Sequence, residues 1–130
     1  MAGFKQQRIN ELLLNFLGEK VRLLQDPRLQ YLSITSVEVS RDMKYATVHW
    51  SAPARKVAED GIYMSLEEFP DKEQQEEIVQ GLQKAKKYLK ALIGQELDLR
   101  NTPDLVFKYD ESLERGSRID SLLSKIGQQP

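Results

Sequence analysis

The sequence predicts a single α+β domain, and three observations support this prediction. A chain of 130 residues has the usual length of one domain and can bury one hydrophobic core. Apolar residues recur at helical spacing in two long segments, and short segments rich in β-branched and aromatic residues lie between and after them. The chain contains no internal repeat and no second segment that could form a core alone. We therefore treat residues 1–130 as one domain.

The first segment, Phe4 to Gln25, is predicted to be an amphipathic helix. Its apolar residues recur at three- and four-residue spacing and so share one side of the helix: Ile9, Leu12, Leu13, Phe16, Leu17 and Leu24. The helix should end at Asp26-Pro27, because proline disfavours helical geometry in the residue before it.

Two strands should follow, Leu32 to Ser40 and Tyr45 to Ser51, joined by a polar turn into an antiparallel hairpin. Alternate residues of the second strand should face the core, and these are Ala46, Val48 and Trp50. The alternation is less regular in the first strand, where Ser36 suggests a bulge.

Residues 52–70 are predicted to form a long acidic loop with at most a short helical turn. The stretch contains Pro53, Gly61 and scattered charges without a sustained period. Glu59 to Glu77 holds eight acidic residues and one lysine, so it carries a net charge of −7 and leaves +6 on the rest of the chain. The overall charge of −1 therefore conceals enough basic residues for an anion-binding face.

Three further elements complete the predicted order α-β-β-α-β-α. Pro70 to Leu97 has a helical apolar stripe, Leu105 to Tyr109 is a strand, and residues 117–127 form a short helix that Ser117 and Asp120 would cap. The inward positions of all elements predict the core: Leu13, Phe16, Leu17, Ile34, Val48, Trp50, Leu82, Leu89 and Phe107.

Catalysis is the minority interpretation of this sequence. His49 is the only histidine and occupies an outward strand position, and Asp110 and Glu111 are adjacent in an extended segment, so their side chains should point to opposite faces. There is no cysteine, no glycine-rich phosphate loop and no metal-ligand cluster. We expect no cofactor and no small-molecule substrate, and we expect the chain to be neither exported nor inserted in a membrane.

A basic cluster on the second long helix is the strongest binding signal. Lys84, Lys86, Lys87 and Lys90 lie within two helical turns, and the last three fall opposite the apolar stripe. Four ammonium groups at this spacing can meet several phosphates. Composition alone favours the alternative, a solvated helix face that aids solubility.

Four stretches of the chain carry a family resemblance: Asp26-Pro27-Arg28-Leu29, Ile34 to Ser51 (ITSVEVSRDMKYATVHWS), Leu97 to Asp110 (LDLRNTPDLVFKYD) and Arg118-Ile119. In this order they resemble the ribosome-binding factor A family, and the resemblance spans most of the chain. It implies a KH-like domain of order α-β-β-α-α-β, in which an alanine-centred helix kink replaces the usual GxxG loop. Ala85 matches that alanine, and Lys87 stands where the family favours glycine. We expect the helix to be interrupted near Ala85.

The resemblance also implies a function. It implies a factor that binds the small ribosomal subunit and its rRNA during late rRNA maturation and supports growth in the cold. We expect a cytoplasmic monomer that contacts phosphates, with ribosomal proteins as further candidate partners. The expected phosphate-contacting residues are Arg8, Arg22, Arg28, Lys84, Lys86, Lys87, Lys90 and Arg100, with Arg115 and Arg118 as weaker candidates. The competing class is a protein-interaction adaptor that uses the acidic loop or a strand edge without touching RNA.

Overall fold

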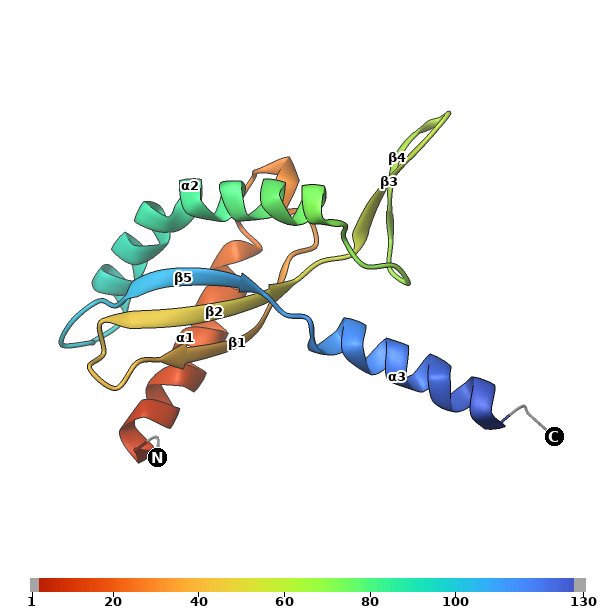
Figure 1. Ribbon diagram of the computed structural model, residues 1–130. Coiled ribbons are helices and arrows are strands. Elements are labelled where there is room, and N and C mark those ends of the chain that lie inside the picture. Colours follow the sequence, from red (N-terminus) through yellow and green to blue (C-terminus); the bar gives the residue numbers. More distant parts are fainter. Residues whose placement is uncertain (1–2, 128–130) are drawn as a thin grey trace.

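The computed structural model describes residues 3–127, and its centre is a three-stranded sheet of order β1-β2-β5 (Figure 1). Strands β1 (Ser33–Val39) and β2 (Tyr45–Ser51) pair antiparallel, as predicted, and their register is irregular between Ile34 and Ser36, where we expected a bulge. Strand β5 (Asp104–Tyr109) pairs parallel with β2. This parallel pairing requires the crossover that the long helix provides.

One face of the sheet carries the core, and the helices α1 (Phe4–Val21) and α2 (Lys72–Glu96) cover it. Ala46, Val48 and Trp50 are fully buried, which confirms the predicted facing of the second strand. Seven of the nine predicted core residues are buried, and Phe16 and Ile34 are half-buried against the core. The opposite face of the sheet is polar and half-exposed, as at Thr47 and His49.

The first helix is shorter than predicted and ends at Val21. Backbone amides of Leu23 and Leu24 bond to carbonyls three residues earlier, so the chain leaves the helix in tight turns. The short 3₁₀ helix η1 (Pro27–Leu29) follows, and the Asp26 carboxylate caps it by accepting from the Arg28 amide at 3.0 Å.

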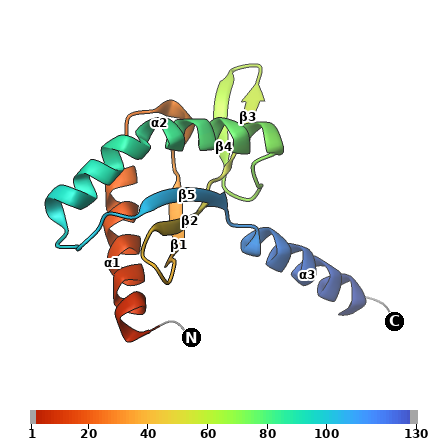
Figure 2. The ribbon, with the colours of Figure 1, turned by 60° about the vertical axis from the view of Figure 1, so that its left-hand side comes forward.

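The prediction that the second long helix is interrupted near Ala85 is wrong. Helix α2 is continuous through Ala85, because alanine and the lysines that follow it are all good helix formers. The helix is nevertheless not straight, since its ribbon changes direction about midway in both views (Figures 1 and 2). The chain thus has a bent helix rather than two helices separated by a break.

The expected long acidic loop over residues 52–70 is also wrong, because it contains a second, two-stranded sheet. Strands β3 (Ala54–Ala58) and β4 (Gly61–Ser65) pair antiparallel around the two-residue turn Glu59-Asp60. Gly61 has a φ of 137°, which disfavours any residue with a side chain. The Asp60-Gly61 dipeptide followed by Ile62 and Tyr63 was the sequence signal for this hairpin.

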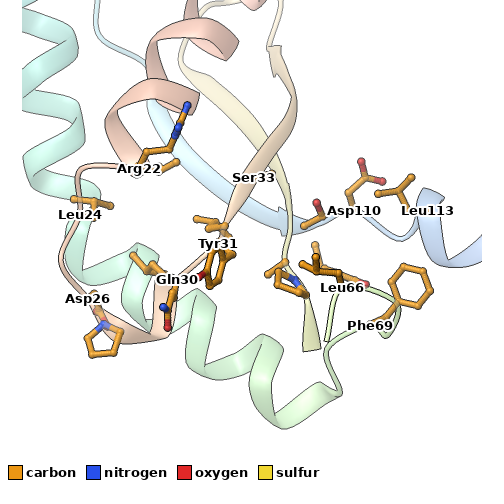
Figure 3. A pocket seen from close by; sticks show the side chains of 18 of the residues that line it. Arg22, Leu24, Asp26, Gln30, Tyr31, Ser33, Leu66, Phe69, Asp110 and Leu113 are labelled. Atoms are coloured by element: carbon orange, nitrogen blue, oxygen red, sulfur yellow. The ribbon is translucent and has the colours of Figure 1, made fainter. Parts of the chain in front are cut away.

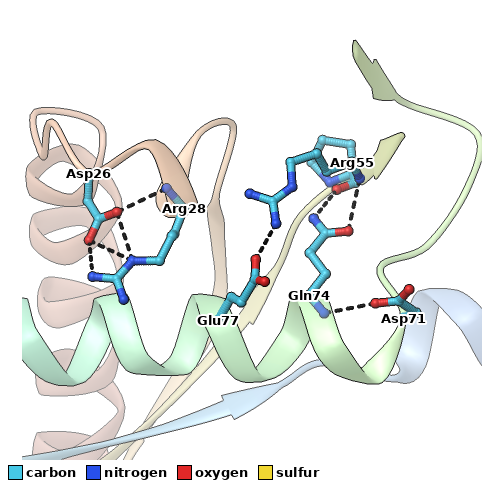
Figure 4. Close-up of polar contacts among 7 residues, drawn as sticks. Asp26, Arg28, Arg55, Asp71, Gln74 and Glu77 are labelled. Atoms are coloured by element: carbon cyan, nitrogen blue, oxygen red, sulfur yellow. Dashed lines mark hydrogen bonds and ion pairs between the residues drawn. The ribbon is translucent and has the colours of Figure 1, made fainter. Parts of the chain in front are cut away.

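The base of this hairpin is fixed to the start of α2 by a buried glutamine (Figure 4). The Gln74 amide donates to the Pro53 carbonyl at 3.0 Å and accepts from the Arg55 backbone amide at 2.9 Å. The Arg55 guanidinium also pairs with Glu77. Three contacts therefore set the direction in which the hairpin leaves the body.

Gln74→Leu should loosen this attachment. Leucine can neither donate nor accept, so the Arg55 amide and the Pro53 carbonyl would lose their partner, which costs about 1–3 kcal/mol for half-buried groups. Hydrogen exchange of the Arg55 amide should become roughly tenfold faster or more. Gln75→Leu is the matched control, because that side chain bonds only to the Pro70 carbonyl. Unchanged protection at Arg55 would contradict the anchoring role.

The C-terminal helix begins earlier than predicted. Helix α3 (Ser112–Gly127) places Ser117 inside the helix rather than at its cap, and Asp110 instead accepts from the Ser112 amide at 2.9 Å. The helix leads away from the sheet in both views (Figures 1 and 2). No helix between residues 3 and 127 is long and apolar enough to cross a membrane.

Candidate nucleic-acid interface

The predicted phosphate-contacting residues fall into four groups, and three of them lie beside helix α2 or the loop that follows it. The first group consists of Arg28 in η1 and Lys84 in the middle of α2, and both residues line the same hollow. Gly81 lets η1 pack closely against α2, because a Cβ at this position would lie 3.0 Å from the Leu29 side chain and 3.2 Å from the Asp26 carboxylate. Two cations that are far apart in sequence are thereby brought together.

Arg28 is held by Asp26 in a two-point contact (Figure 4). Its Nε lies 3.0 Å and its terminal nitrogen 2.7 Å from the two carboxylate oxygens. The hydrogen bonds from Arg28 lower the pKa of Asp26 below its ordinary value of 3.8, with Lys84 adding a weaker attraction. The guanidinium is therefore oriented, and the Asp26 carboxylate already balances its charge.

This pair should make stability depend on acid pH. Because the pKa of Asp26 is lowered on folding, its contribution is complete above about pH 4 and is lost as the pH falls through the lowered pKa. Asp26→Asn keeps an oxygen for the η1 cap but removes the charge. The variant should have a lower urea midpoint than the parent at pH 7, and the difference should shrink toward pH 2.5. A difference that grows on acidification would contradict this assignment.

The second group is the lysine cluster itself, and one acid that the sequence analysis missed alters it. Lys86, Lys87 and Lys90 line one shallow surface on α2, as predicted. The Asp104 carboxylate, at the start of β5, lies 3.2 Å from the ammonium groups of both Lys86 and Lys90. These two hydrogen bonds lower the pKa of Asp104. The sequence holds no acid between Lys84 and Lys90, but the fold brings Asp104 from outside that stretch to Lys86 and Lys90. Lys84 and Lys87 are the two exposed members of the cluster that Asp104 does not pair with.

The third group lies at the far end of α2. Arg8 and Arg100 line one pocket of about 1050 Å³, together with Lys5 and the apolar side chains of Ile9 and Leu12. The loop after α2, the first turns of α1 and the β1–β2 turn form its walls. The structure therefore places these two predicted residues together, although they are 92 positions apart in the numbering of the chain.

Arg22 is separated from the other predicted residues. It lines a groove of about 960 Å³ between the end of α1, the ends of the strands, the root of the hairpin and the start of α3 (Figure 3). The other charged side chains of this groove are acidic: Asp26, Glu68 and Asp110. Of the weaker candidates, Arg115 pairs with Glu111 at 2.7 Å.

The polar side chains near His49 bond to one another across neighbouring segments. The His49 Nδ1 lies 3.1 Å from the Ser36 hydroxyl, and the Thr35 hydroxyl donates to Asp110 at 2.5 Å. Within residues 3–127 no group of three or more His, Cys, Asp or Glu side chains could hold a metal ion. The groups near His49 hold the strand end and the start of α3 in place.

Fold and site together define a class of protein: a KH-like domain with one open sheet face and a bent, lysine-bearing second helix. The sequence profile of the ribosome-binding factor A family matches residues 5–123, and the chain belongs to this family. A protein of Halothermothrix orenii named ribosome-binding factor A is 33% identical over 99% of this chain and 93% of its own length.

A crystal structure and a fitted homology model show the same fold. The crystal structure of ribosome-binding factor A from Thermus thermophilus has a TM-score of 0.63 and 22% identity, covering 82% of this chain and 97% of that one. A Thermus thermophilus homology model of ribosome binding factor A, fitted into a cryo-EM map of its complex with the 30S subunit, has a TM-score of 0.56 and 24% identity. It covers 78% of this chain and 91% of that one.

Proposed function

We propose that this protein binds the small ribosomal subunit through its rRNA and acts during late maturation of that rRNA, with a role in growth in the cold. The observation that carries the proposal is the basic surface along the middle of α2, where Arg28 joins Lys84 beside the row of Lys86, Lys87 and Lys90. A relative of the same family has been fitted into a map of a 30S complex, which supports the same partner here.

The chemistry of this surface favours phosphate contact over the reading of bases. Ammonium and guanidinium groups on a rigid helix contact phosphate oxygens, which fix orientation without reporting sequence. Tyr88, which is exposed among the lysines, offers a flat ring for one unstacked base. Specificity then comes from the simultaneous fit of several cationic groups to folded RNA.

Sedimentation of cell extract tests this proposal. The protein should travel with free small subunits at low salt and return to the top of the gradient as salt is raised, because phosphate contacts weaken with ionic strength. A cytoplasmic monomer with no RNA contact would stay at the top at every salt concentration. That result would instead support the adaptor alternative, for which the projecting hairpin is the specific observation.

A further inference from the structure

The hairpin β3–β4, which we call the arm, has the shape of a docking element. It projects beyond the body in both ribbon views (Figures 1 and 2), and the contacts of Gln74 and Arg55 with α2 hold its base (Figure 4). A two-stranded hairpin alone in water is marginally stable. Within the described chain each of its strands has one hydrogen-bonded neighbour, so the outer edge of each strand is available for another strand.

The distal half of the arm exposes an apolar pair. Val57 and Ile62 are opposite each other in the register and therefore share one face of the hairpin. Their exposed fractions are 82% and 67%. Two large β-branched side chains held side by side in water gain free energy when a partner covers them.

The charge around this apolar pair is negative. Glu59 and Asp60 form the turn at the tip, and the two cations of the arm are already paired, Arg55 with Glu77 and Lys56 with Glu68. Hydrogen bonds from Lys56 and Ser65 lower the pKa of Glu68. A surface of this kind repels phosphates and attracts lysine and arginine side chains.

The groove at the root of the arm is also apolar and acidic on balance, with Asp26, Glu68 and Asp110 against one cation, Arg22. Leu66 and Tyr31 line it with exposed fractions of 84% and 62%, and Asp110 lies beyond them (Figure 3). Hydrogen bonds from Ser112 and Thr35 lower the pKa of Asp110 and hold its negative charge in place. Tyr31 has a φ of 61°, a left-handed conformation that is uncommon for residues other than glycine and that is found at ligand-binding sites.

We propose that the arm and this groove form a docking surface for a basic, apolar-containing polypeptide segment of the particle that the protein binds. The segment lies along the arm, covers Val57 and Ile62, and continues over Leu66 into the groove. In this arrangement the lysines of α2 contact phosphates, and the arm contacts protein. This inference rests on the proposed function, since the partner segment belongs to the small ribosomal subunit.

Site-specific photo-cross-linking on purified small subunits tests this division. A diazirine-bearing phenylalanine analogue replaces Ile62 in one variant, Leu66 in a second and Tyr88 on α2 in a third. All three positions are exposed, so the analogue removes no core contact. After binding at low salt and irradiation, digestion with ribonuclease or with protease shows whether each cross-link joins protein to protein or protein to RNA.

The cross-links at positions 62 and 66 should join to protein, at a segment rich in lysine and arginine, and the cross-link at position 88 should join to rRNA. Adding Glu59→Lys and Asp60→Lys to the position-62 variant should lower its cross-link yield several-fold and leave co-sedimentation through α2 in place. RNA cross-links at 62 and 66, or none there while position 88 reacts, would overturn this inference alone. Failure of the unmodified protein to co-sediment would overturn the proposed function and this inference together.

Discussion

Trp50→Ala is expected to lower the free energy of unfolding by about 3–5 kcal/mol, the usual cost of deleting a large aromatic side chain from a core. Trp50 is fully buried at the end of β2, and its ring lies 5.1 Å from the ring of Tyr109 at an angle of 58°. Among the described residues its Nε1 has no hydrogen-bond partner. The loss therefore comes from packing and cavity formation rather than from a broken hydrogen bond.

Urea titration at pH 7 measures this effect, and Trp50→Phe and Leu23→Ala serve as controls. Trp50→Phe should cost less, because it keeps an aromatic ring and removes an N–H group that is unpaired. Leu23 is exposed, so Leu23→Ala should stay within about 0.5 kcal/mol of the parent. A loss below about 1 kcal/mol for Trp50→Ala would mean that this ring is not part of the core.

The same substitution should be visible at Tyr109. Burial, with additional repulsion from nearby acids, raises the pKa of Tyr109 to about 12. Removal of the Trp50 ring admits water to the phenol, so the pKa should move back toward the ordinary value of 10. Ultraviolet titration of the tyrosines in the folded variant detects this shift.

Lys84→Glu combined with Lys87→Glu should weaken binding to purified small subunits more than any other variant described above. If about four phosphates are neutralised by the basic surface, log affinity for purified small subunits falls with log salt at a slope of roughly −3 to −4. The double variant should make this slope shallower by about two contacts. Its melting temperature should change little, because exposed charges contribute little to stability. These two lysines are chosen because Asp104 already pairs with Lys86 and Lys90.

Lys44→Glu combined with Lys108→Glu is the matched control, since it changes the net charge equally and neither lysine is part of α2. It should leave the slope nearly as in the parent. Asp104→Asn gives a test in the opposite direction, because it releases Lys86 and Lys90 and should make the slope steeper. Equal slopes for the parent, the α2 double variant and Asp104→Asn would mean that the α2 lysines are a solvated face.

Local patterns in the sequence determined most of the fold. Helical periodicity located α1 and α2 because each must bury a continuous apolar stripe, and strict alternation in β2 placed Ala46, Val48 and Trp50 in the core. The arm also has a local sequence signal, the Asp60-Gly61 dipeptide before Ile62. The surrounding acidic residues and Pro53 nevertheless favoured the prediction of a loop. In this segment the turn-forming residues predicted the structure better than the charge composition did.

Tertiary structure decided what the charges do. The sequence predicted a row of lysines on α2, since their spacing follows from helical geometry alone, but the pairing of Lys86 and Lys90 with Asp104 requires β5 to lie against that helix. The approach of Arg28 to Lys84 likewise depends on η1 packing at Gly81. Such contacts join residues distant in the chain, and no local periodicity encodes them. Sequence therefore determined which surfaces carry charge, and only packing determined which charges remain available to a partner.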